Sequence, residues 1–141
     1  MTSLNQNLVM TLGRLHGQLI KKTEQRLSLH GLSFTELKVL KHLAAAPGQS
    51  LRRIDLAEQL SLSASGVTRL LLPMEKRHLV EREANPRDAR VSLVRLATPG
   101  AQCLADAKVT FALVADELLS PLTEDQVKQM QALAELLLDK A

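Results

Sequence analysis

Two short amphipathic helices with only a few residues between them are the feature of this sequence that most restricts its fold. Each is preceded by a serine that we predict to be its cap, Ser50 and Ser63. The segment LSLS (60–63) between them has room only for a tight turn. Apolar side chains recur at helical spacing, at Leu51, Ile54, Ala57 and Leu60 in the first helix and at Val67, Leu70, Leu71 and Met74 in the second. The sequence therefore predicts a helix, a short turn and a second helix.

A hairpin is predicted directly after these helices. Two short segments rich in leucine, valine and arginine, 79–83 and 91–96, flank the stretch ANPRDA, whose Asn-Pro and Asp are typical of a turn. We therefore expect a two-stranded hairpin. Pro73 lies inside the preceding helix, where it removes a backbone hydrogen bond, and it predicts either a kink or an early end of that helix.

Long helical segments flank this central part. Leucines from Leu4 to Leu19 form a stripe that predicts a first helix ending near Gly31. A second helix should follow, capped by Ser33 with Glu36 and stopped at Pro47-Gly48. Thr98 and Pro99 are predicted to start a helix as its cap and first residue, and this helix should break near Ser120-Pro121. A last helix should then begin with a capping box of Thr123 and Gln126. These apolar stripes either wrap the core or pair with a second copy of the chain.

The composition predicts a single soluble, cytoplasmic domain of 141 residues. Phe34 and Phe111 are the only aromatic residues, so the core must be aliphatic and a ligand pocket would be mostly aliphatic too. The single Cys103 excludes an internal disulfide and indicates a reducing compartment. No apolar run is long enough to span a membrane, and no secretion signal is visible, so we expect no membrane association.

Positive charge is concentrated in the first two thirds of the chain. Residues 1–50 carry a net charge of +4 and residues 51–95 a net charge of +3, whereas residues 96–141 carry −4. Ordinary surface charge would explain this pattern, but so would a basic face that meets a polyanion.

The second helix of the central pair has the side chains that the DNA major groove requires. Small residues at its start, 63–66, permit close approach, and the face opposite the apolar stripe carries hydroxyls followed by cations. Arg69 could bind guanine with both arms or grip a phosphate. The candidate DNA-binding residues of this helix are Ser63, Ser65, Thr68, Arg69 and Lys76.

The hairpin adds arginines beside that helix, and Arg87 and Arg90 lie at its tip. A guanidinium on a projecting loop can enter a narrow minor groove, where the negative potential is strongest. Asp88 would face phosphate if it touched DNA, so we expect it to support an arginine or to close the turn.

The segment SASGVTRLLLPMEKRHLVEREANPRDARVSLVRLATPG, with DLAEQLSLS before it, resembles the MarR family of transcriptional regulators, and the resemblance covers nearly the whole chain. It implies a mainly α-helical winged helix-turn-helix with a small β-hairpin wing. It further implies a two-fold homodimer held by terminal helices, binding to a palindromic DNA operator, most often as a repressor, and release by a small-molecule effector. Ser65, Thr68 and Arg69 fall on recognition-helix positions, and Asp88 and Arg90 on the "DxR" pair of the wing. The expected regions within one continuous domain are 1–31 and 99–141 for dimerisation and 32–98 for DNA binding.

Three positions depart from the family pattern: His78 replaces a common glycine, Ala89 a second wing arginine, and Ala97 a leucine. The Ala89 difference leaves open whether Arg87 takes over part of the wing contact.

Other functions have little support. No two of the four histidines share a helical spacing suited to a metal, and no catalytic constellation or cofactor motif is present, so we expect neither an enzyme nor a bound cofactor or metal. Cys103 lies on an apolar helix and is interpreted as a small buried group, although a redox sensor is the alternative. The remaining alternative is a winged-helix module that binds protein instead of DNA.

Overall fold

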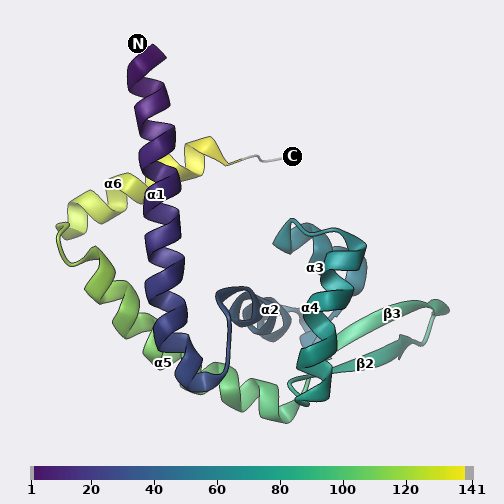
Figure 1. Ribbon diagram of the computed structural model, residues 1–141. Coiled ribbons are helices and arrows are strands. Elements are labelled where there is room, and N and C mark those ends of the chain that lie inside the picture. Colours follow the sequence, from purple (N-terminus) through teal and green to yellow (C-terminus); the bar gives the residue numbers. More distant parts are fainter. Residues whose placement is uncertain (1, 139–141) are drawn as a thin grey trace.

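Helices and one small sheet make up the computed structural model, which describes residues 2–138 (Figure 1). The predicted terminal regions 1–31 and 99–141 therefore include a few positions, 1 and 139–141, that lie outside the described residues. The α-helices are α1 (Thr2–Leu27), α2 (Phe34–Ala45), α3 (Arg53–Leu60), α4 (Ala64–Lys76), α5 (Thr98–Leu119) and α6 (Glu124–Leu137). The strands are β1 (Ser50–Arg52), β2 (Val80–Asn85) and β3 (Asp88–Leu96), and short 3-10 turns occupy Ser28–His30 and Pro47–Gln49.

Local capping explains where several helices begin and end. The Ser33 hydroxyl accepts the Glu36 N–H at 3.1 Å, and the Ser33 N–H donates to Glu36 Oε1 at 2.8 Å, which confirms the predicted capping box. Thr123 and Gln126 form the second predicted box at the start of α6. Gly31 ends the first helical segment at φ 69°, a left-handed conformation that glycine adopts without strain.

Two local predictions were wrong, and one alternative of a third is excluded. Ser50 does not cap α3 but begins the edge strand β1, which pairs antiparallel with β3, so the expected hairpin is part of a three-stranded sheet of order β1-β3-β2. Thr98 is already inside α5, whose N-cap is Ala97. Of the two alternatives for Pro73, an early end of the helix is excluded, because α4 continues to Lys76, and a kink stays a prediction.

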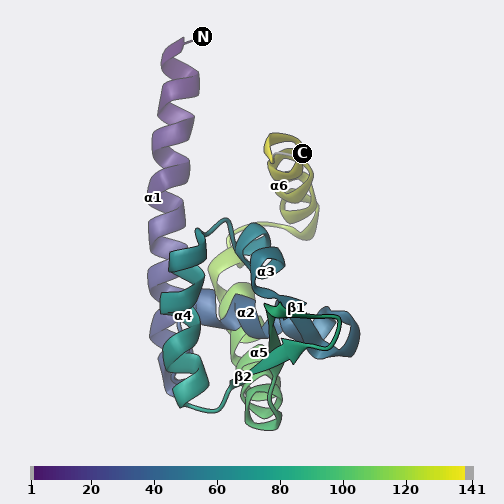
Figure 2. The same ribbon diagram turned by 90° about the vertical axis from the view of Figure 1, so that its right-hand side faces the viewer.

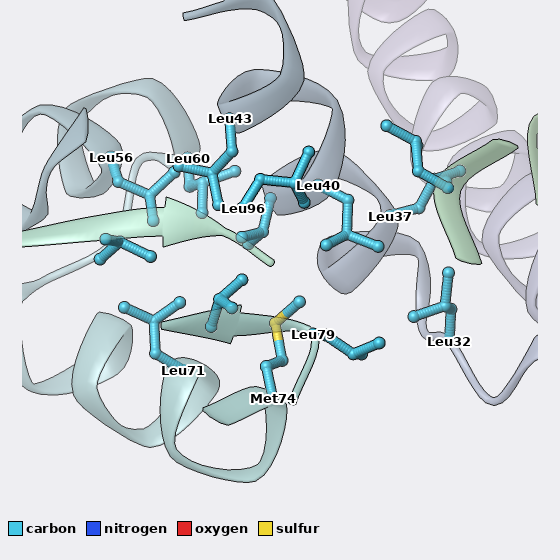
Figure 3. Close-up of a cluster of buried hydrophobic side chains, with 14 of the residues drawn as sticks. Leu32, Leu37, Leu40, Leu43, Leu56, Leu60, Leu71, Met74, Leu79 and Leu96 are labelled. Atoms are coloured by element: carbon cyan, nitrogen blue, oxygen red, sulfur yellow. The ribbon is translucent and has the colours of Figure 1, made fainter. Parts of the chain in front are cut away.

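The core lies where α2, α3 and α4 meet the sheet. Figure 3 shows the leucines of α2 facing Leu71 and Met74 of α4 across this space. The largest fully buried side chains are Leu27, Leu37, Leu40, Leu43, Leu56, Leu71, Met74, Val39, Val67, Val80 and Val94. As the composition predicts, this core is entirely aliphatic, with Phe34 and Phe111 only at its margin. No helix within residues 2–138 is long and apolar enough to cross a membrane.

The terminal helices form arms that extend from this core. The helices α1 and α5 pack against each other, and α5 continues from the sheet along the base of the molecule (Figure 1). The helix α6 overlaps α1 in Figure 1 but stands apart from it in Figure 2. The first half of α1 and the whole of α6 therefore contribute little to the core of the protomer, and α6 contains no buried residue.

The start of α5 packs directly on backbone. A Cβ added to Gly100 would overlap the carbonyl oxygen of Leu79, and the same oxygen accepts the Ala97 N–H at 3.1 Å. A glycine here lets α5 leave the sheet at close range, which ties the arm to the end of the α4–β2 connection.

Replacing Gly100 by alanine should therefore destabilise the protein, although alanine favours helix over glycine by about 1 kcal/mol. Forcing an extra methyl against backbone costs about 1–3 kcal/mol. Gly13→Ala is the matched control, because a Cβ there meets no atom of the protomer within 4 Å, and it should be neutral or stabilising. Urea unfolding at equal protein concentration measures both. A midpoint for Gly100→Ala at or above that of the parent would contradict this packing argument.

Candidate nucleic-acid interface

The start of α4 is exposed and narrow. Ser61 ends α3 in a left-handed conformation at φ 55°, and Ser63 then caps α4 by accepting the Gly66 N–H at 3.1 Å. The Ser63 hydroxyl also lies 3.2 Å from that of Ser65. The tight turn expected from LSLS is thus formed, and small exposed side chains occupy the first turn of α4.

One face of α4 is buried and the opposite face is free, as the apolar spacing predicts. Val67, Leu71 and Met74 are at most 1% exposed, and Leu70 is half-buried. The predicted DNA-binding residues Ser63, Ser65, Thr68, Arg69 and Lys76 are all exposed. The helix therefore presents hydroxyls and then cations to solvent, a surface able to hydrogen-bond base edges or phosphates.

Thr68 differs from its neighbours because its hydroxyl already has partners. It donates to the Ala64 carbonyl at 3.1 Å and accepts a hydrogen bond from Arg53 Nη2 at 3.0 Å. Since a hydroxyl has one proton and two lone pairs, only one acceptor position remains for DNA.

The strands β2 and β3 form a wing beside α4 (Figure 1). At its tip, Asn85 Oδ1 accepts the Arg87 N–H at 2.9 Å, and Asp88 Oδ1 accepts the Arg90 N–H at 3.0 Å. Arg90 Nε lies 3.3 Å from the same Asp88 oxygen, with the Arg90 side chain 92% exposed. Asp88 thus closes the turn and holds an arginine, while Arg87 and Arg90 both project into solvent.

The sequence did not predict the role of two residues next to this surface, Arg53 and Glu75. Arg53, at the start of α3, reaches both Thr68 and Glu75 of α4. The only sequence signal is that Thr68 and Glu75 lie seven residues apart, about two helical turns, on the side of α4 that faces α3. That signal requires knowing how the two helices pack.

Comparisons with known proteins identify this architecture. The sequence model of the MarR family matches residues 32–92, which run from the end of the α1–α2 connection into β3. The HTH-type transcriptional regulator MhqR of Bacillus subtilis is 28% identical over 128 residues, which are 91% of this chain and 87% of MhqR. A mutant MarR from E. coli, solved in complex with operator DNA, is 25% identical with a TM-score of 0.87, and the likeness covers 94% of each chain. Residues 32–92 thus match the MarR family in sequence, and the chain has the fold of solved MarR regulators.

Structural similarity extends beyond the segment that the family model matches. AbsC, a MarR family transcriptional regulator from Streptomyces coelicolor, has a TM-score of 0.86 at 22% identity, with 96% of this chain and 93% of AbsC covered. The arms α1, α5 and α6 are therefore part of the MarR-family fold, although they lie outside the matched segment 32–92, which contains α2, β1, the helix-turn-helix and most of the wing.

Among residues 2–138, the remaining reactive side chains do not form a second chemical site. Burial raises the pKa of the Cys103 thiol, which disfavours the reactive thiolate. Burial, together with Lys38 and Lys41, lowers the pKa of His42. Among residues 2–138, no three His, Cys, Asp or Glu side chains gather as metal ligands would.

Proposed function

We propose that this DNA-binding transcriptional regulator acts as a homodimer that represses transcription from a roughly palindromic operator. The observation that carries the proposal is the exposed polar face of α4 beside a wing whose tip displays Arg87 and Arg90. Ser63, Ser65, Arg69 and Lys76 would meet a major groove, and the wing arginines would reach the adjacent minor groove. The MarR relative solved with operator DNA supports this arrangement.

Neither the comparisons nor the exposed face of α4 supports the alternative of a protein-binding module. A docking helix would present an apolar stripe, whereas the free face of α4 carries hydroxyls and cations, with Leu72 as a single exposed apolar side chain among them. The positive charge of residues 1–95 favours a polyanion and predicts salt-dependent affinity. Binding to DNA also requires the compartment of the chromosome, which supports the cytoplasmic location expected from the sequence.

Two single-arginine variants should distinguish the contact of α4 with base edges from the contact of the wing with the minor groove. Arg69→Ala is expected to weaken binding to a duplex selected in vitro by about 1–3 kcal/mol if the guanidinium reads a base. Arg90→Ala should weaken binding and reduce any preference for A·T pairs flanking the site, because a narrow A·T minor groove attracts arginine. Fluorescence anisotropy with labelled duplexes measures both.

Lys108→Ala is the control, because it removes an equal charge from an exposed position on α5. Its affinity should stay close to that of the parent. Parent-like affinity in both arginine variants would show that the assigned residues do not bind DNA.

Exposed apolar side chains on the arms support the homodimer. Leu4, Leu8, Val9 and Met10 on α1 and Leu133, Leu136 and Leu137 on α6 are each more than half exposed. Apolar patches of this extent on a soluble protein indicate an interface. The arms project beyond the core on one side (Figures 1 and 2), so a second copy can cover them without obstructing α4. In this proposal, regions 1–31 and 99–141 dimerise and 32–98 binds DNA.

Charges placed in these stripes should dissociate the dimer. The parent is expected to sediment as a dimer at micromolar concentration, and a Leu8→Asp, Leu136→Asp double variant should sediment as a monomer, because an unpaired carboxylate opposes burial. Ile54→Asp, at a 60% exposed position on α3 outside the two dimerising regions, should remain dimeric. A monomeric parent in the sedimentation experiment would contradict the proposed interface.

A cavity between the arms and the DNA-binding part is the proposed effector site. It has a volume of about 270 Å³ and is lined by His16, Leu19, Ile20, Thr23, Phe34, Phe111, Ala115, Leu118 and Leu119. Both aromatic residues of the chain gather here, with ring centroids 5.9 Å apart, so the pocket is less aliphatic than the composition suggested. Because α1, α2 and α5 all border the cavity, an apolar ligand there would alter how the arms carry the α4 helices.

Ligand binding at this cavity should raise the melting temperature by mass action. Benzyl alcohol and 1-octanol, two uncharged probes with an apolar ring and an apolar chain, are expected to include at least one compound that stabilises the parent and weakens its binding to DNA. Ala115→Leu fills part of the cavity and should abolish both effects while the protein still binds DNA. Equal shifts in parent and variant, or none in either, would contradict the assignment of this cavity.

A further inference from the structure

A mostly buried arginine joins the two helices of the helix-turn-helix. Arg53 is the first residue of α3, and its guanidinium extends to α4. Nη2 donates to Thr68 Oγ1 at 3.0 Å, and Nη1 lies 3.7 Å from Glu75 Oε1, with the Arg53 side chain only 19% exposed. One cation thus contacts two points of α4 that lie about two turns apart.

Stability alone is a poor explanation for this arginine. Arg53 Nη1 is buried without a hydrogen-bond partner, and an unsatisfied buried donor costs free energy. A buried ion pair often stabilises the folded state no more than apolar side chains of the same volume would. What arginine supplies is geometry, because its planar fork can hold two partners at once, whereas a lysine ammonium acts as a point charge.

The contact with Thr68 continues to the exposed start of α4. The Thr68 hydroxyl that accepts from Arg53 also donates to the carbonyl of Ala64, the first residue of α4. The chain Arg53–Thr68–Ala64 therefore links α3 to the turn that carries Ser63 and Ser65. Glu75 holds the same guanidinium from the last turn of α4.

We propose that Arg53 is a positioning residue for sequence recognition: it sets the orientation of α4 against α3 through Thr68 and Glu75, and it does not contact DNA itself. This inference rests on the proposed function. Base-edge contacts need side chains held at fixed positions, whereas phosphate contacts tolerate small displacements. Loss of Arg53 should therefore reduce specific binding more than non-specific binding.

The test compares the parent with Arg53→Met, Arg53→Lys, Thr68→Val and the Arg53→Met, Thr68→Val double variant. The dissociation constants for an in vitro selected duplex and for a scrambled duplex are measured over a range of salt concentrations. We expect Arg53→Met and Arg53→Lys to lose about tenfold in affinity for the selected duplex, the loss expected from one charge-assisted hydrogen bond. Affinity for the scrambled duplex and the salt dependence should not change. The double variant should lose less than the sum of the two single losses, because both substitutions break the same link.

Arg52→Met is the matched control, because Arg52, the residue just before α3, pairs with Asp55 of α3 at 2.9 Å and does not bridge to α4. Any loss shared by Arg52→Met and Arg53→Met reflects the missing charge alone. Melting temperatures identify variants that fail to fold. If Arg53→Met fails to fold, the comparison is made with Arg53→Lys.

Three results would overturn the inference. A parallel loss for both duplexes, with the slope of log affinity against log salt reduced by about one, would make Arg53 a phosphate contact. Unchanged affinity for the selected duplex in Arg53→Met and Arg53→Lys would remove any role in recognition. Additive losses in the double variant would separate Arg53 from Thr68. If the parent itself does not distinguish the two duplexes, the proposed function fails before any variant is compared.

Discussion

Burial of one face of α4 in an aliphatic core is the constraint on which the rest of this structure depends. Val67, Leu71 and Met74 fill the space between α2, α3 and the sheet, so the opposite face of the helix must point to solvent. The sequence places hydroxyls and cations on that opposite face. A helix fixed this firmly from behind can present its side chains at constant positions, which recognition of base edges requires.

In the proposed homodimer, the arms would present two copies of this surface to one DNA duplex. Because α5 leaves the sheet at Gly100 in contact with Leu79, the arm cannot move without affecting the connection between α4 and β2. Two copies joined by α1, α5 and α6 would hold two α4 helices at a fixed separation. The cavity bordered by α1, α2 and α5 lies at the joint between arm and core, where a ligand of modest size could change that separation.

Much of this fold could be predicted because its signals are local. The capping boxes at Ser33 and Thr123 each need only four residues, and the buried face of α4 follows from helical spacing. The strand β1 could not be predicted because its three residues become a strand only by pairing with β3, more than forty residues away. The bridge from Arg53 to Thr68 was missed for the same reason, since it depends on how α3 and α4 pack. Pro73 left two alternatives open in the sequence, and the continuation of α4 to Lys76 excludes the early end.

Footprinting by hydroxyl radicals on a duplex selected in vitro tests the central claim most directly. If the polar face of α4 reads DNA from each half of a dimer, the duplex should be protected in two patches on one face, about 10 base pairs apart. Selection should also return a sequence with two-fold symmetry. A single protected patch, or uniform protection along every duplex regardless of sequence, would contradict the account.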